Sequence, residues 1–264
     1  MRIWSLMMTA SDLAYFSRKD LSKSAIDLLL ECPALYKAWL EGEDEEKASP
    51  ALSFGSLAHL LTLQPREFGS QYAVTDLNLA TKEGKAWKAA LPDGVQIVKN
   101  DDYEKAQMMA DAVREHPQAK MLFRSYVAES PVYWTFDNMP CKAKPDIVAE
   151  VFGHRYIADL KTTESVNPEA IRKSIARWGY HRQAAWYLSG MEAVGKPCDA
   201  FIFIFVEKTY PYLVTMCQLD EESLAKGMEE CLKAVSILKE CQKTDTWPCY
   251  TREIITLSLP KWAA

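Results

Sequence analysis

The spacing of apolar residues along the chain changes near Ser125 and divides the chain into two parts. Before this point, apolar residues recur at the three- and four-residue intervals of a helix face, as in segments 51–63 and 101–115. Ser24 is placed to cap another of these helices, and Pro33 is placed to open the next one. We therefore predict that the first 120 residues are mainly helical.

Beyond Ser125, the apolar pattern predicts β-strands in five segments: 127–136 with an interruption at Ser130-Pro131, 142–152, 155–161, 200–207 and 212–219. Helical spacing returns over segments 167–189 and 220–243. The order β-β-β-α-β-β-α predicts an α/β fold with one central mixed β-sheet flanked by helices. We expect a single domain over residues 1–264, with residues 1–120 as its helical part and residues 121–264 as its core and C-terminal helix.

The composition is that of a soluble globular protein, because 48% of the residues are apolar and 25% are charged. The longest apolar runs, such as residues 201–206, are far too short to cross a bilayer. Seven cysteines are an odd number and include no CxxC pair, which argues against a disulfide framework. We therefore expect a cytoplasmic protein.

The expected hairpin between segments 142–152 and 155–161 brings three charged residues together. If Gly153 and His154 form a two-residue turn, Asp146 falls opposite Lys161. Residues opposite each other share a face of the sheet, as do residues two apart on one strand. Asp146, Asp159 and Lys161 are therefore predicted to lie on one face. A slip of one residue in the register would move Asp146 to the other face.

Two carboxylates and an ammonium group in one place are unfavourable unless another group balances them. Like charges close together raise one of the two pKa values strongly. A divalent cation removes this conflict, and oxygen ligands suit Mg²⁺ or Mn²⁺. Such a metal can activate water and stabilise charge on a phosphodiester. The alternative is a surface salt bridge between Lys161 and one of the aspartates, and the geometry alone does not separate the two hypotheses.

The motifs around these residues resemble those of the PD-(D/E)xK nuclease superfamily. Segments Lys144–Asp146 and Asp159–Lys161 are similar to its defining motif. Segment Gly55–His59 resembles the GxxxH motif of the RecB-like nucleases, and segment Gln183–Tyr187 resembles their QxxxY motif. Glu129 stands where phage-type exonucleases carry a further acid. All of these occur in the order expected for that superfamily.

This resemblance implies a restriction-endonuclease-like core and a Mg²⁺ site at which Mn²⁺ can substitute. It assigns catalytic roles to four residues: Glu129, Asp146, Asp159 and Lys161. It assigns four metal ligands: His59, Asp146, Asp159 and the backbone carbonyl of Leu160. Without the resemblance, His59 would be a core histidine and Glu129 an exposed strand acid.

One face of the expected helix 167–189 is polar and is a candidate DNA-binding surface. At about 100° per residue, four side chains fall within roughly one-third of the helix circumference: Lys173, Arg177, Gln183 and Tyr187. The net charge is −5, but residues 140–185 hold eight Lys or Arg against five acids, so a basic working face is compatible with an acidic protein. The alternative is a solvated helix face that binds nothing.

A closer resemblance, from segment 21–33 through the rest of the chain, is to RecE-type exonucleases. It implies an exodeoxyribonuclease that degrades one strand of double-stranded DNA from the 5′ end during homologous recombination. It also implies a ring-shaped homo-oligomer and a single-strand annealing protein as partner. Two other functions stay open, namely an endonuclease of the same fold and a DNA-binding module whose nuclease site has degenerated.

Some relatives of these nucleases hold an iron–sulfur cluster with one early and three late cysteines. A similar layout is present here in four residues: Cys32, Cys231, Cys241 and Cys249. The late spacings of ten and eight residues are wider than such clusters usually have. Buried, unreactive thiols are the preferred interpretation.

Overall fold

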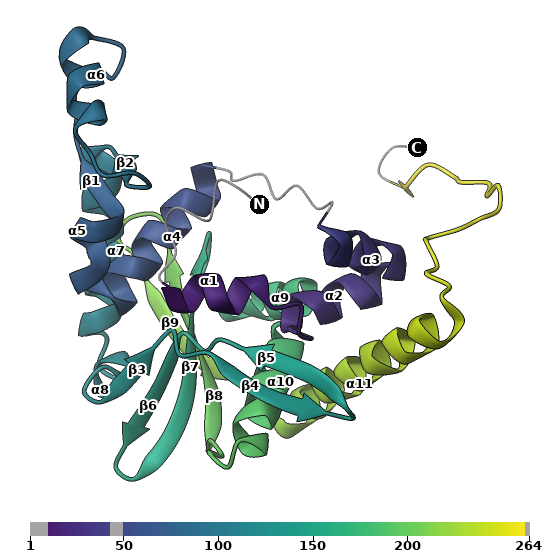
Figure 1. Cartoon of the computed structure of the whole chain (residues 1–264). Helices are drawn as coiled ribbons and strands as arrows, with labels where there is room; N and C mark the ends of the chain where they lie inside the picture. The colour runs from purple at the N-terminus through teal and green to yellow at the C-terminus, as the bar shows by residue number, and fades with distance from the viewer. Residues whose placement is uncertain (1–9, 43–49, 262–264) are drawn as a thin grey trace.

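The computed structural model describes residues 10–42 and 50–261. A five-stranded sheet lies at its centre, in the order β3-β6-β7-β8-β9 (Figure 1). Its strands are β3 (Tyr126–Ala128), β6 (Ile147–Val151), β7 (His154–Thr163), β8 (Ala200–Glu207) and β9 (Val214–Gln218). Only β7 and β8 pair in parallel, and the other neighbours are antiparallel. The mixed sheet and its flanking helices confirm the predicted fold class.

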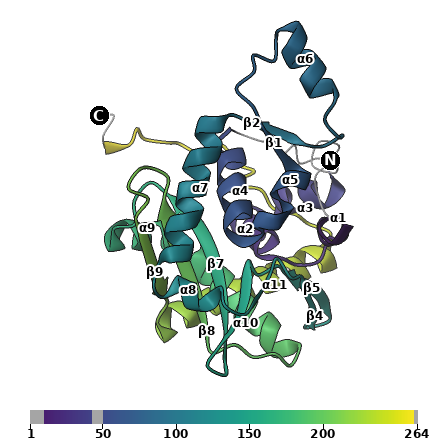
Figure 2. The same ribbon diagram turned by 90° about the vertical axis from the view of Figure 1, so that its left-hand side faces the viewer.

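Helices cover both faces of this sheet. One face packs against α4 (Pro50–Leu63) and α7 (Asn100–Glu115), which lie in front of the sheet in Figure 2. The other face packs against α9 (Pro168–Trp178) and α10 (Tyr180–Ala193). Alternation along β8 explains this division, because Ile204 belongs to the first core and Phe203 and Phe205 belong to the second.

A third apolar cluster lies beyond α10. Its side chains come from the hairpin of β4 (Val132–Phe136) and β5 (Met139–Ala143), and from the helices α2 (Lys23–Glu31), α3 (Pro33–Glu41) and α11 (Glu221–Thr244). The fully buried Trp186 of α10 contacts Trp134 of β4, with ring centroids 5.2 Å apart. Helix α10 therefore joins the sheet to this cluster.

The remaining elements are short. They are α1 (Ala10–Ser17), a 3₁₀ turn (Pro65–Glu67), α5 (Phe68–Gln71), β1 (Tyr72–Val74), α6 (Lys82–Ala89), β2 (Gln96–Val98) and α8 (Ala119–Leu122). Strands β1 and β2 form a small parallel pair, which the sequence pattern did not predict. Among the described residues, no helix is both long enough and apolar enough to cross a membrane.

Several boundaries differ from the predictions. The predicted strand 142–152 is two strands, β5 and β6, because the chain leaves one sheet and enters another at Lys144–Asp146. The predicted helix 167–189 is also two helices, since Gly179 adopts the left-handed conformation with φ +62° and ends α9. The cap of α2 is Ser22, which accepts from the N–H of Ala25, and not Ser24.

The hairpin turn between β6 and β7 is also shifted. Its two residues are Phe152 and Gly153, both with positive φ, so that Val151 pairs with His154. The predicted turn at Gly153-His154 is therefore wrong by one position, and the pairing moves by two residues. A shift of two leaves every side chain on its predicted face.

Candidate metal centre

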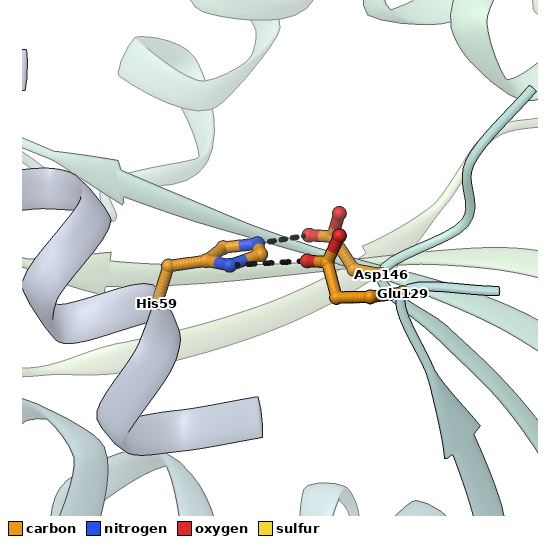
Figure 3. Close-up of side chains that lie close together, drawn as sticks. All are labelled: His59, Glu129 and Asp146. Atoms are coloured by element: carbon orange, nitrogen blue, oxygen red, sulfur yellow. Dashed lines mark hydrogen bonds and ion pairs between the residues drawn. The ribbon is translucent and has the colours of Figure 1, made fainter. Parts of the chain in front are cut away.

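Three side chains from distant parts of the chain meet at the ends of strands β3 and β6. In Figure 3, His59 of α4 points with both ring nitrogens toward carboxylates. Its Nε2 lies 2.8 Å from Oδ2 of Asp146, and its Nδ1 lies 3.3 Å from Oε1 of Glu129. One ligand atom from each residue lies within 4.8 Å of the others. This arrangement has the donor set and the spacing of a metal site.

The backbone holds both carboxylates at the same end of the sheet. Glu129 directly follows β3 and has φ +53°, an uncommon conformation for a residue other than glycine. Its N–H donates to the carbonyl of Asp146 at 3.0 Å and extends the β3–β6 pairing by one bond. The carboxylate of Asp146 accepts from the N–H of Leu160 at 2.8 Å, so the side chain continues the pairing with β7.

Asp159 lies next to this group and is 2% exposed. Its Oδ1 accepts from the ammonium of Lys161 at 2.7 Å and from the side-chain amide of Gln183. In a β-strand, the backbone N–H and C=O of one residue point to the same side of the strand. The N–H of Leu160 points to the carboxylate of Asp146, so the carbonyl of Leu160 lies on the same side of β7 as that carboxylate.

The two aspartates have opposite pKa shifts. Burial and the adjacent Asp146 raise the pKa of Asp159 to about 7, despite the nearby ammonium of Lys161. Burial also acts to raise the pKa of Asp146, but the positive charge and hydrogen bond of His59 outweigh it and lower the value to about 2. The site therefore contains more negative charge than its buried surroundings stabilise.

Positive groups balance part of this charge. Burial acts to lower the pKa of His59, but Asp146 and Glu129 raise it to about 9. The imidazolium thus forms an ion pair with each of two carboxylates. Burial likewise acts to lower the pKa of Lys161, and Asp159 and Asp146 raise it. A divalent ion bound among the same carboxylate oxygens would supply positive charge to them, as His59 and Lys161 do here. The residues of this site therefore fit such an ion.

The structure places the predicted site residues in two groups. The first group converges at the ends of β3, β6 and β7: His59, Glu129, Asp146, Asp159, Leu160, Lys161 and Gln183. Tyr187 lies close by and its hydroxyl is hydrogen-bonded to the backbone of Lys144. The second group, Lys173 and Arg177, is exposed on α9.

The predicted polar face that joins these two groups on one helix is therefore wrong. Gly179 redirects the chain between α9 and α10, so the face does not continue from Arg177 to Gln183. Gln183 is 8% exposed and contacts Asp159, instead of facing solvent. Trp178, which the same helical projection placed on the apolar face, is exposed.

Two residues of the site were not identified from the sequence. Lys144 forms an ion pair with Glu129, and its place beside the Pro-Asp motif was a signal that it lies near the metal ligands. Tyr180 holds its ring 4.7 Å from the ammonium of Lys161. No sequence signal marked Tyr180, because its position depends on the helix break at Gly179.

The cysteines do not gather into a further site. All seven are free, and Cys249 is exposed whereas Cys32, Cys231 and Cys241 are buried. Within the described ranges, the one group of three or more potential metal-binding residues is that of His59, Glu129 and Asp146.

Comparisons with known proteins give a family match and similar structures. The profile of a family described as "PDDEXK-like domain of unknown function (DUF3799)" matches residues 22–258. The structure of a candidate exonuclease from Eubacterium rectale is similar to this one, with a TM-score of 0.67 over 96% of each chain. The two sequences are 13% identical. A phage-related exonuclease from Haemophilus somnus 129PT is 12% identical, with a TM-score of 0.38, covering 86% of this chain and 96% of that one. Comparison with curated protein sequences gives no match.

Proposed function

Since this chain belongs to the PDDEXK-like family, we propose that it is a Mg²⁺-dependent exodeoxyribonuclease that degrades one strand of double-stranded DNA from its 5′ end. The observation that carries the proposal is the convergence of three acids, His59 and Lys161 at one end of the central sheet. These are the residues that the nuclease motifs specify. Their joint presence at one place in the structure argues against a degenerate site.

The metal would be held by carboxylate oxygens of Asp146 and Asp159, by His59 and by the carbonyl of Leu160. When bound, it would supply a Lewis acid that lowers the pKa of water and stabilises the charge on the phosphodiester. Glu129 would hold His59 from the opposite ring nitrogen and orient it, since the distance between Nδ1 and Oε1 is 3.3 Å.

Lys161 and Gln183 have separate roles in this proposal. The ammonium of Lys161 would orient the attacking water or stabilise the negative charge of the scissile phosphate. Its hydrogen bond to Asp159 at 2.7 Å keeps it beside the proposed metal ligands. Gln183 donates to the same carboxylate oxygen and would fix its direction, so its role is to position Asp159 and not to contact DNA.

The remaining features of the proposal come from the resemblance to RecE-type exonucleases. They are a ring-shaped homo-oligomer, a single-strand annealing protein as partner, and a role in homologous recombination. The exposed Lys173 and Arg177 of α9 are the proposed contacts to DNA phosphates, because both side chains lie on the surface of the helix.

The deciding experiment compares linear duplex DNA with covalently closed circular duplex in Mg²⁺. An exonuclease degrades the first and leaves the second intact, whereas an endonuclease of the same fold cuts both. A 5′-labelled linear duplex should release its label early. Asp146→Ala and Asp159→Ala should abolish Mn²⁺ binding and cleavage together. Cleavage of linear DNA in excess chelator would refute the metal-dependent mechanism.

A further inference from the structure

The aromatic ring of Tyr180 lies against the ammonium group of the proposed catalytic lysine. The Nζ atom of Lys161 is 4.7 Å from the centroid of this ring. Tyr180 is the first residue of α10 and follows the left-handed Gly179, so the helix break places the ring there. The ammonium therefore has Asp159 as a hydrogen-bond partner and an aromatic ring within cation–π distance.

The ring is itself held from behind by the neighbouring strand. Phe205 of β8 pairs with Lys161 of β7, and Phe203 pairs with Asp159. The ring of Tyr180 stacks on Phe203, with centroids 5.8 Å apart and an interplanar angle of 30°. It also contacts Phe205 at 6.2 Å. These rigid aromatic contacts leave the ring little freedom to move away from Lys161.

Ion pairs fix the backbone around Tyr180. Arg182, two residues later, bonds to Asp27 of α2 at 2.9 Å and to Glu230 of α11 at 2.7 Å. Lys23 of α2 donates to the carbonyl of Trp178 at 2.7 Å. The start of α10 is therefore attached to two other helices, α2 and α11.

We propose that Tyr180 is a positioning residue for Lys161, and that its ring, not its hydroxyl, holds the ammonium beside Asp159. This inference rests on the proposed nuclease function, in which Lys161 acts on water or the scissile phosphate. The ring attracts the cation through its electron-rich face, and it excludes water from one side of the ammonium. Without the ring, the lysine samples positions from which it does not reach the reacting atoms.

The test compares three substitutions at one position. Tyr180→Phe retains the ring, whereas Tyr180→Leu and Tyr180→Met fill similar space without one. On linear duplex DNA in saturating Mg²⁺, the Phe variant should keep kcat within about twofold. The other two should lose roughly tenfold in kcat with KM nearly unchanged. Tyr210→Leu, which alters a tyrosine that is 84% exposed, serves as the matched control and should behave as wild type.

A second measurement does not depend on cleavage. Acylation of Lys161 by an amine-reactive reagent is followed by mass spectrometry of the full-length protein over a range of pH. Labelling should be several-fold faster in Tyr180→Leu and Tyr180→Met than in wild type and Tyr180→Phe, because the ammonium is freed from the ring.

The two measurements separate the inference from the function on which it rests. If wild type does not cleave DNA, the proposed function fails, and the labelling pattern still reports whether the ring holds Lys161. Equal labelling in wild type and the two ringless variants would overturn the inference, even with an active enzyme. A Phe variant as impaired as the Leu variant would assign the effect to the hydroxyl and overturn it as well.

Discussion

Lowering the pH from 9 to 6 should weaken binding of Mn²⁺ to the metal-free protein by roughly a thousandfold or more. Two groups carry this dependence, because each must lose a proton before it can bind the ion. They are His59, with its pKa raised to about 9, and Asp159, with its pKa raised to about 7. Between pH 7 and 9 only His59 must be deprotonated, so the affinity should change about tenfold per pH unit. Below pH 7 both groups are protonated, and the change should approach a hundredfold per unit.

Calorimetry in buffers of different ionisation enthalpy measures both the affinity and the protons released. Release should be about two protons per Mn²⁺ at pH 6 and about one at pH 8. His59→Gln should remove the dependence above pH 7, and Asp159→Asn should remove the additional dependence below it. His154→Gln, which alters an exposed histidine at the other end of β7, should change neither. An affinity that stays constant between pH 7 and 9 in wild type would refute the assignment of His59 as a ligand.

Three further predictions concern other parts of the molecule. Lys161→Ala should abolish cleavage and leave Mn²⁺ affinity within a few-fold of wild type; loss of both would make Lys161 structural. Replacing Lys173 and Arg177 together by Ala should make the plot of log binding constant against log salt concentration less steep by about two, for DNA binding in Ca²⁺. Replacing Lys233 and Lys239 of α11 is the control and should leave this slope unchanged. Trp186→Ala should reduce the free energy of unfolding by about 3–5 kcal/mol in urea titrations, because the indole is fully buried; a loss under about 1 kcal/mol would contradict this packing.

The sequence by itself determined the part of the site that depends only on backbone periodicity. Asp159 and Lys161 are two residues apart on one strand, so they share a face of the sheet whichever strand pairs with it. The continuous apolar run of segment 200–207, rich in aromatic and β-branched residues, likewise identified β8 with its observed bounds. The order of the motifs along the chain indicated the family, which the match to residues 22–258 shows independently.

Features that depend on contacts between distant segments were decided only by the tertiary structure. The turn at Phe152-Gly153 differs from the predicted one, and Asp146 kept its predicted face only because the resulting shift was an even number of residues. A glycine inside a helical pattern is compatible with a continuous helix. Gly179 ends α9 here in a structure where Arg182 is bonded to Asp27 and Glu230 on two other helices.

The surroundings of His59 also separate what the sequence determines from what only the tertiary structure decides. Its helical spacing is equally suited to a buried core residue and to a ligand, because periodicity fixes the direction of a side chain but not what it meets. The tertiary structure brings Asp146 and Glu129 to its two ring nitrogens from the ends of two strands. Partners that lie 70 and 87 residues away in the chain are set by how α4 packs on the sheet, which local spacing does not encode.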